Sequence, residues 1–128
     1  MTMTALQARI APGFTVNDLS RSIGFYEALG FEVSERHERE GQLRFVRMKA
    51  GAAELGLGQD DFAKGKDRAK GVGMRVMINT GQDLHAVAAH AKAAGIKLDS
   101  EVEKTPWGPL AFSVTDPDGF KLTILNES

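Results

Sequence analysis

The chain has 128 residues, 42% of them hydrophobic and 26% charged, which suits one compact domain or two small halves that share a core. Its net charge of −1 excludes the strong basic field that favours nucleic acid and the acidic excess that favours cationic partners. The absence of cysteine excludes disulfides, thiolate nucleophiles and cysteine-bound metals.

The first predicted elements are a strand and a helix. Residues 9–16 alternate between apolar and small side chains, which predicts a strand, and Pro12 places it at a sheet edge or a bulge. Asn17 or Asp18 can cap the next helix, because a short polar side chain accepts from the free N–H groups of the first turn. Apolar residues recur at helical spacing as far as Gly30, which suits a C-terminal cap.

Three further strands should complete the first half. We expect a strand to begin at 31–34, a polar turn at 35–41, and a hairpin formed by 43–48 and 53–57.

The register of that hairpin depends on its turn. A two-residue turn at Ala50-Gly51 would place Arg47 opposite Glu54, and Phe45 opposite Gly56. All four side-chain positions would then share one face of the sheet.

The second half follows the same plan. Residues 72–78 alternate as a strand, and Asp83 can cap a helix that has one apolar stripe. The remaining elements are expected in chain order as a weak strand at 96–102, a Pro-Trp-Gly-Pro loop at 106–109, a strand at 110–114, a tight turn at 116–119 and a last strand at 120–124.

A repeat relates the two halves. The runs at 18–33 and 83–98 both begin with Asp-Leu, continue as a helix and pass through a Gly into a strand. This duplication predicts an α+β fold in one structural domain: two βαβββ modules with paired half-barrel sheets and one helix on each outer face. We place the first module at 1–58, a linker with solvated charges at 59–71, and the second module at 72–128.

Each helix covers one face of its sheet, so the opposite face must meet the other half, another chain or a ligand. Small residues and a few charges line that open face, which is typical of a cavity more than of a packed core. These residues are Ala11, Gly13, Thr15, Phe45, Arg47, Glu54, Gly56, Gly73, Arg75, Ala111, Ser113, Lys121 and Thr123.

The sequence contains Thr-Val-Asn-Asp-Leu at 15–19, Phe-Tyr at 25–26, Leu-Gly-Phe at 29–31, Pro-Trp-Gly at 106–108 and Asp-Pro-Asp-Gly at 116–119. These runs, in this order, resemble the vicinal oxygen chelate superfamily, which includes glyoxalases, extradiol dioxygenases, epimerases and bleomycin-type resistance proteins. The resemblance covers nearly the whole chain and implies the same two-module fold. In character, the chain is closest to the metal-free members that resemble bleomycin resistance proteins.

The enzymes of that superfamily hold a divalent metal through four side chains, usually His and Glu, and leave open positions for substrate oxygens. The resemblance places the corresponding positions at Ala11, Gly56, Gly73 and Thr123. Three of these residues have no donor side chain and threonine is a poor ligand. We therefore expect no metal and no other cofactor.

No other cluster in the sequence replaces that metal site. His37 lies in the charged run, and His85 and His90 are five positions apart on a helix, so they point in different directions. Glu54 is a lone carboxylate that suits acid–base chemistry but offers no metal site by itself. We assign no catalytic residue.

Trp107 is the most suggestive residue for ligand binding. Its Pro-Trp-Gly loop resembles the loop by which bleomycin-binding proteins stack a flat aromatic ligand, although the indole could instead pack against Phe112 or Phe62.

Charged residues of the open face complete the predicted site. Arg47 and Glu54 form either a surface pair or a polar anchor inside a cavity, and Arg75 should meet a ligand anion or Glu54. We predict that Phe45, Arg47, Glu54, Arg75, Trp107 and Thr123 bind the ligand.

Two functions follow from these observations. The empty metal positions favour a metal-independent protein that binds a planar or amphipathic small molecule and sequesters it, for example an aromatic antibiotic or toxin. The alternative is a glyoxalase-type lyase or isomerase, or another enzyme of the superfamily, with a non-standard site.

The expected partners are a small-molecule ligand and a second copy of the chain, because one half-sheet is too open to enclose a cavity. We expect no nucleic acid or membrane partner. Residues 1–5 lack the basic and apolar runs of a signal peptide, and no apolar stretch approaches the ~20 residues that span a bilayer. A soluble, cytoplasmic protein is therefore expected.

Overall fold

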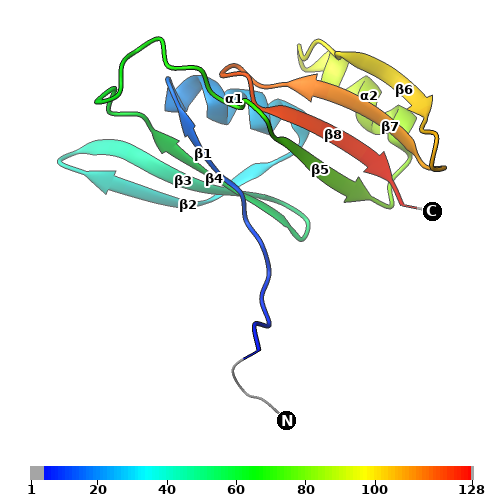
Figure 1. Cartoon of the computed structure of the whole chain (residues 1–128), viewed down its shortest axis with the longest axis horizontal. Coiled ribbons are helices and arrows are strands. Elements are labelled where there is room, and N and C mark those ends of the chain that lie inside the picture. The colour runs from blue at the N-terminus through cyan, green and yellow to red at the C-terminus, as the bar shows by residue number, and fades with distance from the viewer. Residues whose placement is uncertain (1–4, 128) are drawn as a thin grey trace.

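Two four-stranded sheets form the framework of the molecule, and the computed structural model describes residues 5–127 (Figure 1). The predicted outer limits of the modules, residues 1 and 128, lie outside the described residues. So do residues 1–4 of the run 1–5, in which the sequence shows no signal-peptide features. The first half contains β1 (Gly13–Val16), α1 (Leu19–Leu29), β2 (Glu32–Arg39), β3 (Gln42–Ala50) and β4 (Ala53–Gln59). The second half contains β5 (Arg75–Thr80), α2 (Leu84–Ala93), β6 (Ser100–Lys104), β7 (Leu110–Thr115) and β8 (Lys121–Asn126).

The two sheets have the same topology. Their strand orders are β1-β4-β3-β2 and β5-β8-β7-β6, with the first strand of each module parallel to the last. Each half is therefore a βαβββ module, and the predicted two-module α+β fold is confirmed.

Each helix begins after the aspartate that the sequence predicts as its cap. The Asp18 carboxylate accepts a hydrogen bond from the Arg21 backbone N–H at 3.2 Å, and Asp83 accepts one from His85 at 3.0 Å. Gly30 ends α1 with a φ of 124°, and its N–H donates to the Tyr26 carbonyl at 3.1 Å. Neither helix within residues 5–127 is long and apolar enough to cross a membrane.

Three strands begin three or four residues later than predicted. β1 begins at Gly13 instead of residue 9, β6 covers 100–104 instead of 96–102, and β5 begins at Arg75 instead of residue 72. In the last case Gly73 has a φ of +75°, which a continuous strand cannot accommodate, and Val72 before it is 79% exposed.

The predicted polar turn at 35–41 is wrong, because β2 continues through most of it to Arg39. The turn itself is short: Glu40 and Gly41 both have positive φ, at 55° and 78°. The charged residues of β2 lie on an outer strand whose backbone pairs with β3, so the ladder supplies the hydrogen bonds while the side chains remain in water.

The predicted register of the β3–β4 hairpin is also wrong. Arg47 lies opposite Gly56, not Glu54, and Phe45 lies opposite Gly58. The strands end at Ala50 and begin again at Ala53, so the two-residue turn is one position later than predicted. The resulting shift of two positions keeps Phe45, Arg47 and Glu54 on one face, because side chains alternate with a period of two.

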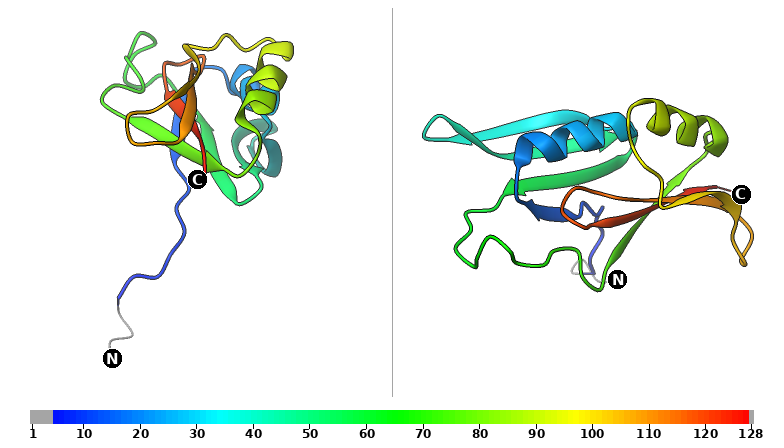
Figure 2. Two further views of the ribbon diagram at one scale, coloured as in Figure 1. Left: turned by 90° about the vertical axis from the view of Figure 1, so that its right-hand side faces the viewer. Right: turned by 90° about the horizontal axis from the view of Figure 1, so that it is seen from above.

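One core joins the modules. The two helices contact each other and lie on the same side of the sheets (Figure 2). Buried apolar side chains from both halves form a single cluster beneath them. At the junction the rings of Phe14 and Phe120 are stacked, with centroids 4.2 Å apart and planes 13° apart. The helices thus cover one face of each sheet, as predicted, and leave the opposite faces open.

Candidate functional site

The open face of the first sheet carries three of the six predicted ligand-binding residues. Phe45 lies across β4, and a Cβ atom added at Gly56 would be 2.9 Å from its Cζ atom. The ring therefore occupies the space that a side chain at position 56 would fill. Phe45 and the glycines beneath it form a flat surface of the kind that a planar ligand can contact.

Arg47 and Glu54 do not pair with each other, so the predicted interaction between them is wrong. Arg47 Nε lies 3.9 Å from Glu35 Oε2, and Glu54 Oε2 lies 3.5 Å from Arg9 Nη2. Both are cross-strand or inter-segment pairs at the surface, which typically contribute about 0–1 kcal/mol. Both side chains nevertheless lie on the open face of the first sheet.

The open face of the second sheet carries the other three predicted residues, and they line one pocket. This pocket has a volume of about 340 Å³ and is lined by Arg75, Trp107 and Thr123, together with Met77 and Ser113. Arg75 Nη1 donates to Thr123 Oγ1 at 2.8 Å, and Ser113 Oγ lies 3.4 Å from the same oxygen. A guanidinium and two hydroxyls are thus held side by side in the lining of the pocket.

Trp107 is the exposed wall of this pocket. The residue is 64% exposed, while Phe112 is completely buried in the core. Most of the indole is therefore free of protein contacts. A large aromatic side chain left in water beside a cavity is typical of a binding surface.

The six predicted residues do not meet within one chain. The pocket at Trp107 contains none of Phe45, Arg47 and Glu54. The single cavity predicted between a first and a second half stays a prediction that would need a second copy of the chain.

Met77 is a pocket residue that the sequence interpretation missed. It lies two positions after Arg75 on β5, so both side chains face the same side of the sheet. The apolar alternation predicted from the sequence used Val76 and Ile78, which lie on the opposite face of β5. Extending the open face past Arg75 would have included Met77.

The four superfamily metal positions do not fit a metal in this chain. Ala11, Gly56 and Gly73 carry no donor side chain, and Thr123 Oγ1 already accepts from Arg75. Within residues 5–127, no group of three or more His, Asp or Glu side chains is arranged to hold a metal ion.

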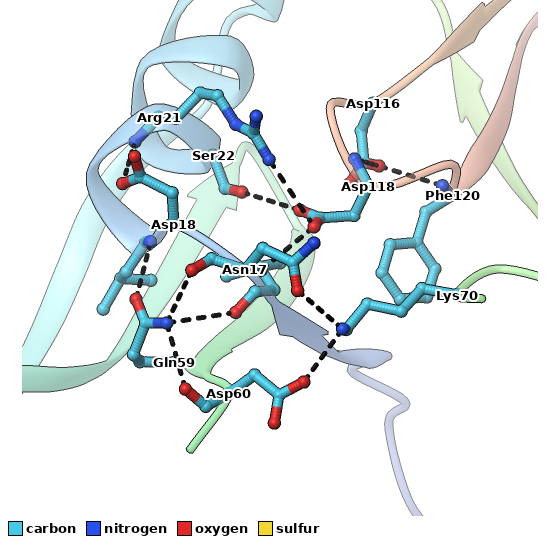
Figure 3. Close-up of polar contacts among 12 residues, drawn as sticks. Asn17, Asp18, Arg21, Ser22, Gln59, Asp60, Lys70, Asp116, Asp118 and Phe120 are labelled. Atoms are coloured by element: carbon cyan, nitrogen blue, oxygen red, sulfur yellow. Dashed lines mark hydrogen bonds and ion pairs between the residues drawn. The ribbon is translucent and has the colours of Figure 1, made fainter. Parts of the chain in front are cut away.

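A polar network beside the module junction was not predicted (Figure 3). Lys70 Nζ donates to Asn17 Oδ1 at 2.7 Å and lies 2.8 Å from Asp60 Oδ2. The hydrogen bond from Lys70, then that from the Phe62 N–H and the nearby charge of Arg68, lower the pKa of Asp60 to about 2. The Lys70 side chain is only 5% exposed, so the prediction of solvated charges in the linker is wrong at this position.

The Asp-Pro-Asp-Gly turn binds the second module to the first. Asp118 accepts from the Asn17 N–H at 3.0 Å and from Ser22 Oγ at 3.3 Å (Figure 3). Asp116 accepts from the Tyr26 hydroxyl at 2.8 Å, and burial raises the pKa values of both Asp116 and Tyr26. Every one of these groups has a protein partner, so the turn acts as a structural connection and not as a site.

Two βαβββ modules that leave one face of each sheet open define a vicinal oxygen chelate protein. The chain belongs to the Glyoxalase/Bleomycin resistance protein/Dioxygenase superfamily, whose family model matches residues 7–124. A search of curated protein sequences found no match.

Solved structures with the same fold span almost the whole chain. A member of the glyoxalase/bleomycin resistance/dioxygenase superfamily from Sphaerobacter thermophilus has 23% identity and a TM-score of 0.74, covering 94% of this chain and 98% of its own. A bleomycin-binding protein complexed with bleomycin has 20% identity and a TM-score of 0.70, covering 95% and 100%. A bleomycin resistance determinant encoded on the transposon Tn5 has 19% identity and a TM-score of 0.70, covering 95% and 99%.

Proposed function

We propose that this chain binds a small planar or amphipathic molecule without a metal and sequesters it, for example an aromatic antibiotic or toxin. The observation that carries the proposal is the exposed indole of Trp107 at the pocket that Arg75 and Thr123 also line. The pocket volume of about 340 Å³ lies at the lower end of the range of about 300–1,000 Å³ typical of small-molecule sites.

Two further observations support binding over catalysis. The four superfamily metal positions offer no adequate donor set within the described residues. Two of the similar structures are, by their descriptions, a bleomycin-binding protein with its drug and a bleomycin resistance determinant. Capture of a drug-like molecule is therefore the activity we assign to the open faces.

We further propose that two copies of the chain pair through these faces. Phe45, Arg47 and Glu54 of one copy would then lie across the ligand from Arg75 and Trp107 of the other. All residues that line the pocket at Trp107 belong to the second module, so one side of a bound ligand would face solvent. A second copy of the chain that covers this side would bury more of the ligand's surface.

Sedimentation at micromolar concentration should therefore give the mass of a homodimer. A variant such as Met77→Glu, which places a carboxylate on the open face of the second sheet, should shift the protein toward the monomer. A monomeric wild-type protein would contradict the pairing and would restrict the proposed site to the Trp107 pocket.

Replacement of Trp107 by alanine should weaken binding of a planar aromatic ligand by about ten-fold or more, or about 1.4 kcal/mol, because the stacking surface is lost. The ligand is first found by screening aromatic compounds for quenching of Trp107, the only tryptophan in the chain. Affinity for the variants is then measured by calorimetry, since Trp107→Ala removes the fluorescent group.

Trp107→Phe is the matched control and should retain most of the affinity, because it keeps an aromatic face. Elemental analysis of the same protein after exposure to zinc, nickel, iron and manganese should give far less than one ion per chain. About one tightly bound ion would favour the glyoxalase-type enzyme instead, and unchanged affinity in Trp107→Ala would show that the indole does not stack on the ligand.

A further inference from the structure

Two cations lie next to each other on the open face of the second sheet. Arg75 on β5 is in register with Lys121 on β8, so their side chains extend from the same face of neighbouring strands. Both residues are exposed. Like charges on adjacent strands destabilise a sheet unless an opposite charge compensates for them.

No carboxylate of the described residues compensates for this pair. The ion pairs formed within residues 5–127 include neither Arg75 nor Lys121. Among the described residues, the Arg75 side chain donates only to the neutral Thr123 hydroxyl. Thr115, the residue opposite Lys121 on β7, is also neutral.

The neighbouring Lys70 behaves differently. It lines the same hollow of about 610 Å³ as Arg75 and Lys121, and no acidic residue of the range 5–127 lines that hollow. The Lys70 ammonium, however, is bound to Asp60 and Asn17 within the junction network (Figure 3). Of the three cations around the hollow, only Arg75 and Lys121 are free to bind another group.

This hollow adjoins the pocket at Trp107, because Arg75 lines both. We propose that the ligand of this chain carries an anionic group, a carboxylate or a phosphate, that binds Arg75 and Lys121 while its apolar part lies against Met77 and Trp107. The inference rests on the proposed function, because it names the chemical class of the molecule bound at that same site.

The donors suit such an anion. A guanidinium binds two oxygens of one carboxylate or phosphate through parallel hydrogen bonds, and a lysine adds a point charge. The Arg75 guanidinium is held in place by Thr123, so less side-chain freedom is lost on binding. Glu103 also lines the Trp107 pocket, but it comes from β6, at the opposite edge of the sheet from Arg75 on β5. It forms none of the ion pairs of the described residues, so it leaves the charge of Arg75 uncompensated.

The test compares two dyes that share an aromatic frame and differ in charge, anilinonaphthalene sulfonate and neutral N-phenylnaphthylamine. We expect the wild-type protein to bind the sulfonate about ten-fold or more tightly than the neutral dye. Arg75→Gln and Lys121→Gln should each weaken sulfonate binding about five-fold or more and change neutral-dye binding by less than about two-fold. Lys97→Gln removes a charge from an exposed position outside both pockets and should change neither affinity.

The outcomes separate this inference from the proposed function. Equal binding of both dyes, unaffected by Arg75→Gln but weakened by Trp107→Ala, would overturn the anion preference and leave the aromatic site intact. Binding of neither dye would contradict the proposed function itself. If Arg75→Gln changed the oligomeric state and not the dye preference, Arg75 would serve to pair with a carboxylate of a second copy, and the inference would be wrong.

Competition identifies the anion. Displacement of the sulfonate by benzoate would indicate a carboxylate, and displacement by inorganic phosphate would indicate a phosphate. Displacement by neither, even at low ionic strength where charge interactions are strongest, would contradict a charge-based site.

Discussion

Gly71→Ala should destabilise the protein by about 2–5 kcal/mol, among the largest effects of a single methyl group in this fold. Gly71 has a φ of +72°, where a residue with a Cβ atom is strained by roughly 1–2 kcal/mol. Its Cβ would also lie 2.4 Å from the Gly119 carbonyl oxygen and 2.9 Å from Phe120 Cα. Overpacking of this kind typically costs about 1–3 kcal/mol.

The obstructing atoms belong to backbone that cannot easily move. The Phe120 N–H donates to Asp116 Oδ1 at 2.9 Å, and the Gly119 N–H donates to the Asp116 carbonyl at 3.1 Å. Urea denaturation of both proteins measures the difference in unfolding free energy.

Gly73→Ala is the matched control. Gly73 has nearly the same φ, +75°, but a Cβ added there has no heavy atom within 4 Å. Only the backbone strain remains, so we expect a loss of about 1–2 kcal/mol, smaller than that of Gly71→Ala. Equal losses in the two variants would show that the approach of Gly71 to Gly119 does not limit stability.

Phe120→Ala should lower the unfolding free energy by about 3–5 kcal/mol, the usual cost of truncating a buried phenylalanine. The side chain is 7% exposed and stacks on Phe14 from the other module. The substitution therefore removes core volume and also the aromatic contact that joins the two halves. Thermal unfolding followed by circular dichroism gives the change in midpoint.

Trp107→Ala provides the comparison, because it removes a larger aromatic side chain that is 64% exposed. Its unfolding midpoint should stay close to that of the wild-type protein. A double variant, Phe14→Ala with Phe120→Ala, should lose less than the sum of the single losses, because the two rings contact each other. Additive losses would mean that the stacked pair has no coupling energy.

The elements that the sequence predicts well are those fixed by neighbouring residues. Asp18 and Asp83 cap the helices that follow them, and Gly30 ends the first helix, because each acts within one turn of the chain. The duplication around the two aspartates then led to the two-module fold. At these positions the preferences of single residues for helix ends match the helix limits in the folded protein.

The errors occur where the local pattern is ambiguous or where distant residues decide the structure. A glycine can occupy either position of a two-residue turn, so Gly51 did not fix the hairpin register. The polar run after Ser34 resembles a turn in isolation, but its backbone pairs with β3. Lys70 resembles a solvated residue until Asn17, 53 positions away, is brought beside it by the fold.

In the candidate site, too, local patterns predicted some features correctly, while features that depend on distant residues were not predicted. Side-chain alternation correctly placed Phe45, Arg47 and Glu54 on one face, because a register error of two positions preserves that face. The partners of these charges, Glu35 and Arg9, come from segments whose placement no local pattern specifies.

The charged side chains of β2 have a consequence for the behaviour of the protein at high concentration. β2 and β6 each form one of the two edges of their sheet, opposite β1 and β5, and acidic and basic residues occupy most of both strands. An added strand would have to place its own side chains among these charges and strip them of water, so fibril-like growth at the β2 and β6 edges is disfavoured. The protein can therefore keep its open faces accessible to a ligand while the β2 and β6 edges do not act as templates for aggregation.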